Sequence, residues 1–103
     1  PAESLNDRDQ ASEVVVLSVQ KDGACYLGIG AEKAQPVNCD TLEPRLQDVA
    51  ELMTNKPQPP VLVRADREVK YDQVIKGMTA LRNTGAIKVG LSTAPPDGSA
   101  SQR

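Results

Sequence analysis

The sequence predicts an α+β fold: a two-layer sandwich in which a mixed β-sheet carries two helices on one face, in the order β-β-(β)-α-β-α-β. Three observations predict it. Short segments alternate apolar and polar residues, two longer segments repeat apolar residues at helical spacing, and turn residues separate these segments. With only two helices, both most simply cover the same face of a single sheet.

The first part of the sheet is predicted as a hairpin followed by a third, short strand. Residues 14–20 (VVVLSVQ) are rich in β-branched side chains, and the turn sequence KDG at 21–23 leads into a returning strand over residues 24–29. A short extended segment over residues 35–38 follows a loop. These segments predict three neighbouring strands.

The first predicted helix covers residues 41–56. Its apolar residues fall on one stripe, and they are Leu42, Leu46, Val49, Ala50 and Met53. Asp40 and Glu43 have the spacing of a capping box, and Pro44 falls in the first turn, where proline is tolerated. Three prolines between residues 57 and 60 end this helix.

The second predicted helix covers residues 70–84 and connects two further strands. Its apolar side consists of Tyr71, Val74, Ile75, Met78 and Leu81. Gly77 costs a helix about 1 kcal/mol relative to alanine, which indicates close packing there, and Gly85 is the expected C-terminal cap. The strands over residues 61–65 and 87–92 therefore form a parallel crossover.

The folded unit is predicted to span residues 14–93, between two polar segments. Residues 1–13 carry a local charge of −3 and one large apolar residue, Leu5, so we expect a disordered linker. Residues 94–103 are rich in Pro, Gly and Ser, so we expect a flexible C-terminal tail. Because the chain begins at Pro1, we also expect that an upstream segment has been removed.

The composition excludes several classes of function. The 103 residues include two Tyr but no His, Phe or Trp, so a histidine-based triad and an imidazole ligand for zinc are excluded. The net charge of −2 and the scarcity of aromatic residues argue against nucleic acid as a partner. No apolar run approaches the roughly 18 residues of a membrane span. The sequence thus indicates a non-enzymatic domain without a metal or cofactor.

The densest cluster of charges lies between the fourth strand and the second helix. Three carboxylates there, Asp66, Glu68 and Asp72, could form a metal site or an acid–base pair. Arg and Lys side chains are interleaved with them and would neutralise them, whereas a hard cation needs several oxygen ligands with few competing cations. The pattern therefore favours a solvated loop or a docking surface.

Cys25 and Cys39 could be free thiols, a redox centre or a disulfide. They do not form a CxxC motif, which argues against a redox centre. If residues 24–29 pair antiparallel with residues 35–39, Cys25 lies opposite Cys39, close enough for a bridge after a small adjustment. We expect this disulfide, and with it an oxidising compartment.

The sheet face opposite the helices is predicted to be partly apolar. Its residues are Val14, Val16, Tyr26 and Leu62, mixed with Ser18, Arg64, Lys88 and Ser92. Such a face is a candidate surface for self-association or for a partner.

The segment over residues 61–93 resembles the periplasmic domain of the ExbD/TolR family. The similarity lies in the strand that runs into Arg64-Ala65-Asp66, in the Val69-x-Tyr71 motif and in the closing Val89-Gly90-Leu91. Residues 64–66 favour the ExbD branch, whereas residues 92–95 (STAP) are closer to TolR endings. The cysteine pair and the long loop over residues 28–35 depart from the family pattern.

The resemblance implies a non-enzymatic subunit of a membrane motor. Family members are single-pass inner-membrane proteins of Gram-negative bacteria, with a transmembrane helix inside an ExbB/TolQ-like channel and a periplasmic domain that forms a homodimer. They couple the proton motive force to a TonB- or TolA-like protein, and some are said to bind peptidoglycan. The membrane aspartate of the family lies outside this sequence. We expect Leu5, Arg64, Asp66 and Tyr71 to contact the partner.

Overall fold

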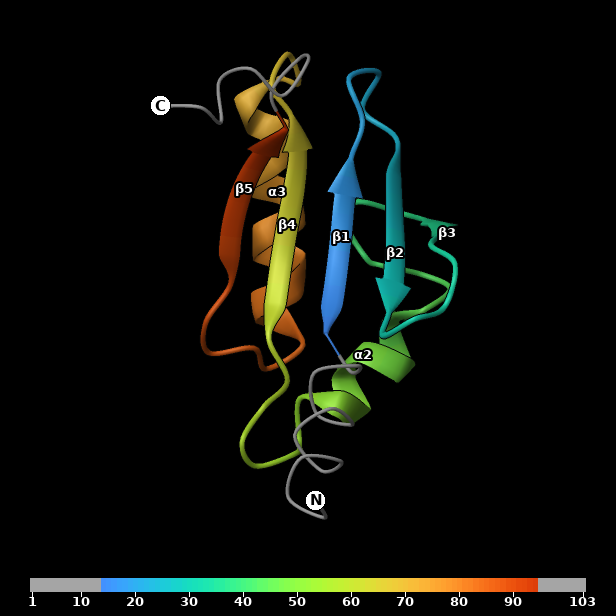
Figure 1. Ribbon diagram of the computed structural model, residues 1–103, viewed down its shortest axis with the longest axis vertical. Helices are drawn as coiled ribbons and strands as arrows, with labels where there is room; N and C mark the ends of the chain where they lie inside the picture. The colour runs from blue at the N-terminus through green and yellow to red at the C-terminus, as the bar shows by residue number, and fades with distance from the viewer. Residues whose placement is uncertain (1–13, 95–103) are drawn as a thin grey trace, which may run out of the picture.

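The computed structural model describes residues 14–94, which form one five-stranded mixed sheet and two helices (Figure 1). The strands are β1 (Val15–Val19), β2 (Cys25–Ile29), β3 (Gln35–Val37), β4 (Val61–Asp66) and β5 (Gly90–Ala94), and the helices are α2 (Leu46–Leu52) and α3 (Tyr71–Asn83). Across the sheet the order is β3-β2-β1-β4-β5. Pairing is antiparallel within β1–β2–β3 and parallel within β1–β4–β5. The predicted α+β fold, including its parallel crossover, is confirmed.

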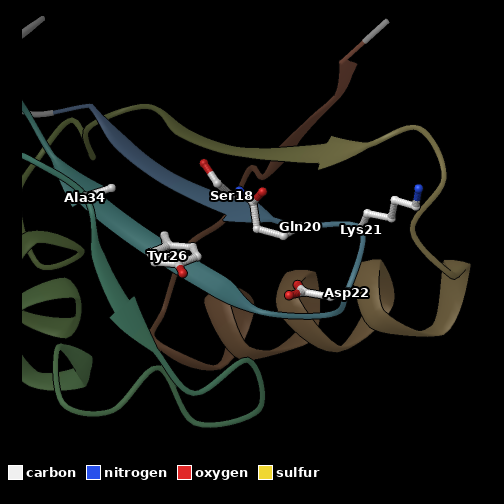
Figure 2. Close-up of a pocket in the computed structure, with 6 residues that line it drawn as sticks. All are labelled: Ser18, Gln20, Lys21, Asp22, Tyr26 and Ala34. Atoms are coloured by element: carbon white, nitrogen blue, oxygen red, sulfur yellow. The ribbon is translucent and has the colours of Figure 1, made fainter. Parts of the chain in front are cut away.

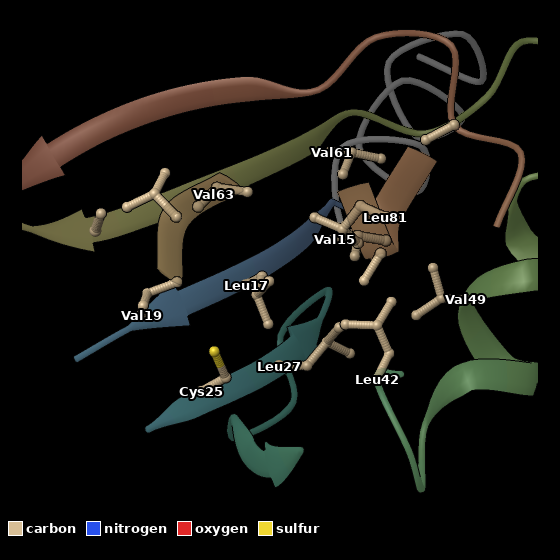
Figure 3. Packing of buried hydrophobic residues seen from close by; sticks show 14 of the residues in the cluster. Val15, Leu17, Val19, Cys25, Leu27, Leu42, Val49, Val61, Val63 and Leu81 are labelled. Atoms are coloured by element: carbon tan, nitrogen blue, oxygen red, sulfur yellow. The ribbon is translucent and has the colours of Figure 1, made fainter. Parts of the chain in front are cut away.

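One aliphatic core lies between the sheet and the helices (Figure 3). Side chains alternate along a strand, so every second residue of β1 and β4 is buried on the same face. Helix α3 covers this face with Val74, Ala80 and Leu81, and α2 adds Val49. Both helices therefore share one core, while the other face of the sheet is left open by residues 14–94.

Gly77 brings α3 unusually close to the centre of the sheet. A Cβ atom at this position would lie 2.8 Å from Cδ2 of Leu17, a fully buried residue in the middle of β1. Such a contact is too short for two carbon atoms. The glycine therefore has the packing role that its helical position indicated.

The first helix is much shorter than predicted. It begins at Leu46, and the capping box is wrong, because the side chain of Asn38 instead accepts hydrogen bonds from the amides of Asp40 and Thr41 (2.8 and 3.0 Å). Leu42 is fully buried at a positive φ of 66°, and the Glu43–Pro44 peptide bond is cis. The predicted first turn of the helix is therefore absent. Leu42 instead takes a left-handed backbone conformation that no α-helix contains, and this places its side chain in the core.

Two predicted positions in the second half also differ. Tyr71 is 73% exposed and Ile75 is 39% exposed, because the close contact at Gly77 turns the glycine side of α3 toward the sheet. The last strand begins at Gly90 and not at Ile87, whose amide donates to the side chain of Gln58 and not to β4. Lys88 accordingly lies in the loop before β5 and not on the open face.

Cys25 and Cys39 form a disulfide with a Cα–Cα distance of 5.5 Å. The register expected for this pair is wrong, since Cys25 lies opposite Val37 and Cys39 lies beyond the end of β3. The bridge thus fixes the chain just after a three-residue edge strand that has few backbone pairs of its own.

An ion-pair cluster holds the loop before β3 against the start of α2. The guanidinium of Arg45 pairs with Glu32 from the loop and with Asp48 from the helix, the latter at 2.8 Å. The hydrogen bond from Arg45 lowers the pKa of Glu32 below its ordinary value of 4.5. The cluster therefore acts at neutral pH as a second attachment of this loop.

Removing the disulfide is expected to destabilise the domain. Closing a loop of this length contributes up to about 3 kcal/mol in the chain-entropy model, so the Cys25→Ser/Cys39→Ser variant should unfold at a clearly lower urea concentration. Adding a reductant should lower the midpoint of the native chain and leave the variant unchanged. Two free thiols in the mass spectrum of non-reduced protein exported to the periplasm would contradict the bridge.

Gly77→Val is expected to destabilise the domain by about 2 kcal/mol, because the new side chain overlaps the fully buried side chain of Leu17, which must shift. The measurement is urea unfolding followed by circular dichroism. Thr79→Val on the exposed side of α3 is the matched control and should change stability little. Equal stability of the two variants would show that the close approach is not tight.

Glu32→Gln is expected to lower stability at pH 7 by about 0.5 kcal/mol, a typical value for a partly exposed ion pair. Because folding lowers the pKa of Glu32, the ion pair stabilises the native state above the ordinary pKa, and this gain is lost as the pH falls through the folded value. Urea unfolding at pH 7 and pH 3 should therefore show a larger difference between native chain and variant at pH 7 than at pH 3. A difference of the same size at both pH values would point to packing and not to charge.

Candidate functional site

The open face of the sheet carries a shallow polar depression. Ser18, on β1, lies between Tyr26 on β2 and Arg64 on β4 in the sheet register. Beside them a depression of about 760 Å³ opens between β1, β2 and the hairpin turn (Figure 2). Its lining residues are Ser18, Gln20, Lys21, Asp22, Tyr26 and Ala34. One aromatic ring among hydroxyl, amide and charged groups suits a weakly bound polar ligand or a partner surface.

Arg64 and Asp66 lie on this open face, because the buried Ala65 between them points into the core. Arg64 is exposed and pairs in register with Ser92 of β5. Asp66 is half-buried, and its carboxylate accepts the amide of Glu68 at 2.9 Å. The Asp66 side chain thus shapes the turn into α3, a structural role that the sequence alone did not indicate.

Tyr71 lies in the other layer of the molecule. It is the first residue of α3, the helix that packs on the opposite face of the sheet, and 73% of its surface is exposed. Arg64, Asp66 and Tyr71 therefore sit near the same end of β4 without forming one pocket. The fourth predicted contact residue, Leu5, lies outside the described residues.

The carboxylates of the charged loop are not arranged as a metal site. Glu68 forms an ion pair with Lys21 of the hairpin turn at 3.4 Å, and Asp66 is engaged in its own turn. Across residues 14–94, no three side chains of His, Cys, Asp or Glu come together as metal ligands. The Lys21–Glu68 pair instead joins the two loops at this end of the sheet.

β5 forms one edge of the sheet, and its start was predicted three residues too early, at residue 87 and not at Gly90. β5 is the last strand of the sheet, and no segment within residues 14–94 pairs with its outer side. Leu91 on this strand is half-exposed. An edge strand with unpaired backbone groups and an exposed apolar side chain can accept a further strand. The opposite edge, β3, carries Pro36 and has only three residues, so it is a poorer acceptor.

A groove at the other end of the sheet was missed by the sequence analysis. It has a volume of about 770 Å³ and lies between the segment that follows α2 and the loop that precedes β5. Its apolar lining includes Met53, Pro57, Pro59, Pro60 and Ile87. In the sequence the run of prolines indicates only the end of a helix, although a rigid proline-rich segment is also a suitable groove wall.

Neither helix of the described part, residues 14–94, is long and apolar enough to cross a membrane. Comparison with known proteins identifies the family of this chain. Residues 1–96 match the family described as biopolymer transport protein ExbD/TolR.

Three curated relatives illustrate the match. The chain is 34% identical over 92 residues to the Tol-Pal system protein TolR of Pseudomonas aeruginosa, covering 86% of this chain and 63% of the relative. It is 31% identical over 93 residues to the biopolymer transport protein ExbD of Neisseria gonorrhoeae (89% and 61%). It is 29% identical over 91 residues to ExbD of Escherichia coli K12 (88% and 59%).

The alignments thus span between 59% and 63% of the length of these relatives. The family match covers nearly the whole chain, including the β4–α3–β5 unit that carries Arg64, Asp66 and Tyr71. The chain therefore belongs to the ExbD/TolR family of biopolymer transport proteins.

Proposed function

We propose that this chain is the periplasmic domain of an energy-transducing subunit driven by the proton motive force. In this proposal an inner-membrane segment outside the sequence joins an ExbB/TolQ-like channel subunit, and the domain couples that motor to a TonB-like protein for import across the outer membrane. The observation that carries the proposal is that the described part of the chain leaves the outer edge of β5 and the neighbouring sheet face uncovered, in a chain of this family.

The edge of β5 suits a partner that must be held under load. A strand added there is bound mainly through backbone hydrogen bonds, which form along its whole length and tolerate many sequences. Arg64 lies one strand inward from this edge, and Tyr71 is exposed at the start of α3. We assign both residues, together with Leu5, to contacts with the partner, and Asp66 to holding the turn between them.

We place a second copy of the chain on the open sheet face. Val16 and Leu62 are neighbours there in the sheet register, and both are only half-buried. An apolar patch of this kind favours association with another surface. A homodimer formed through this face leaves the outer edge of β5 accessible.

The Tol-Pal system is the second candidate function. It is favoured by the 34% identity to a TolR protein, compared with 31% and 29% to the two ExbD proteins. A TolR-like role would replace TonB with a TolA-like partner. Peptidoglycan binding would then use the polar depression around Tyr26, where an aromatic ring and polar groups suit a sugar chain. Retention on purified sacculi at physiological salt, lost in Tyr26→Ala, would identify that activity.

The test of the coupling function places a charge on the β5 edge of the full-length protein. Leu91→Lys should lower capture of the partner's periplasmic domain about tenfold, since a lysine on an edge strand opposes pairing with another strand. Import through TonB-dependent transporters should fall with it. Loss of envelope integrity with normal import would assign the chain to the Tol-Pal system.

The matched control is Thr79→Lys, which adds the same charge to the exposed side of α3. Urea unfolding of both variants checks that the Leu91 substitution leaves the fold intact. If a stably folded Leu91→Lys protein supported import and envelope integrity as well as the control does, the proposed role of the edge would be wrong.

A further inference from the structure

One side chain, Gln58, connects the two walls of the groove between the segment after α2 and the loop before β5. Its amide nitrogen donates to the carbonyls of Met53 and Gly85 (2.9 and 2.8 Å), and its amide oxygen accepts the amide of Ile87 at 3.0 Å. These three hydrogen bonds fix the segment after α2 to the loop before β5. The groove is therefore preformed, which lowers the cost of filling it.

The lining of the groove combines apolar and cationic groups. Ile87 is 81% exposed, a large fraction for an isoleucine beside three prolines. Lys56 and Lys88 line the same groove, one on each wall, and both are exposed. This arrangement fits a peptide that carries an apolar side chain among acidic ones.

Residues 1–13 of the same chain combine acidic side chains with one large apolar side chain, and they join the described part of the chain beside the groove. The amide of Val15 donates to the carbonyl of Pro60 at 2.9 Å, and Pro60 lines the groove. Val14, to which residues 1–13 are joined, therefore lies close to the groove. They carry a net charge of −3 and one large apolar side chain, Leu5.

We propose that residues 1–13 dock into this groove, with Leu5 against Ile87 and the prolines and with the acidic side chains beside Lys56 and Lys88. Eight residues lie between Leu5 and Val14, so nine Cα–Cα steps join them, and a flexible chain of nine steps spans roughly 16 Å. Tethering of this kind gives an effective concentration in the millimolar range, so even a weak contact is substantially occupied. This contact describes the domain without its partner, since Leu5 cannot contact the groove and the partner at the same time.

The test uses the 103-residue chain with a nitroxide spin label at Ser4→Cys, because both native cysteines are in the disulfide. Docking should broaden the amide signals of Ile87, Lys88 and Gly90 to about half their intensity or less, given the high local concentration of the arm. Leu5→Ser and Ile87→Ser should each restore these signals, and Ile75→Ser on α3 should not. Lys56→Glu/Lys88→Glu should restore them as well.

A second sample separates the possible occupants. Isotope-labelled chain without nitroxide is mixed with unlabelled chain that carries it. Broadening of the groove signals in this mixture would mean that a second copy fills the groove and would overturn the proposal. Broadening that centres on Val14 and Val15 and ignores the Leu5 and Ile87 substitutions would show an undocked arm and would also overturn it.

Discussion

The contact between Gly77 of α3 and Leu17 of β1 is the constraint on which the rest of the fold depends. β1 is the central strand, so the residue opposite the glycine lies at the middle of the sheet. Gly77 and Ala80 allow this close approach on the buried side of α3, while Tyr71 and Ile75 are turned toward solvent. Together with α2, the helix closes a core made of aliphatic side chains.

The same packing makes the two faces and two edges of the sheet unequal. Within residues 14–94 both helices contribute to a single core, so the second face has no cover and the apolar residues on it are only partly buried. At one edge β3 is short, contains proline and is tied down by the disulfide and by Arg45. At the other edge, none of the described residues pairs with the outer side of β5. The surfaces available for binding are thus the second sheet face and the outer edge of β5, which the core leaves uncovered within the described residues.

The sequence predicted the fold well because most of its signals are local. Alternation in β1, β2 and β4, the apolar spacing of α3 and the glycine at its C-terminus depend on neighbouring residues alone. The failures needed long-range information. Leu42 takes a left-handed conformation to reach the core, and Ile87 leaves β5 because its amide bonds to Gln58, 29 residues away. The groove is likewise built from two segments that are distant in the sequence.

The candidate site was predicted only in part for a related reason. The resemblance to the ExbD/TolR family led to Arg64, Asp66 and Tyr71 as contact residues, but strand alternation and helix packing decide that they lie in two layers. The turn that uses the Asp66 carboxylate is visible only in three dimensions.

The parallel direction of β1, β4 and β5 has a mechanical consequence. The chain enters β1 at Val14 at one end of the sheet, and β5 ends at Ala94 at the opposite end. Tension applied between the N-terminal segment and a strand bound along β5 would run parallel to the strands and perpendicular to the direction in which they separate. The hydrogen bonds of both ladders would then be loaded in shear, all at once, and not opened one after another as in a zipper. Loading of this kind resists more force than opening the same hydrogen bonds one at a time, so the direction of the strands suits a domain that transmits tension.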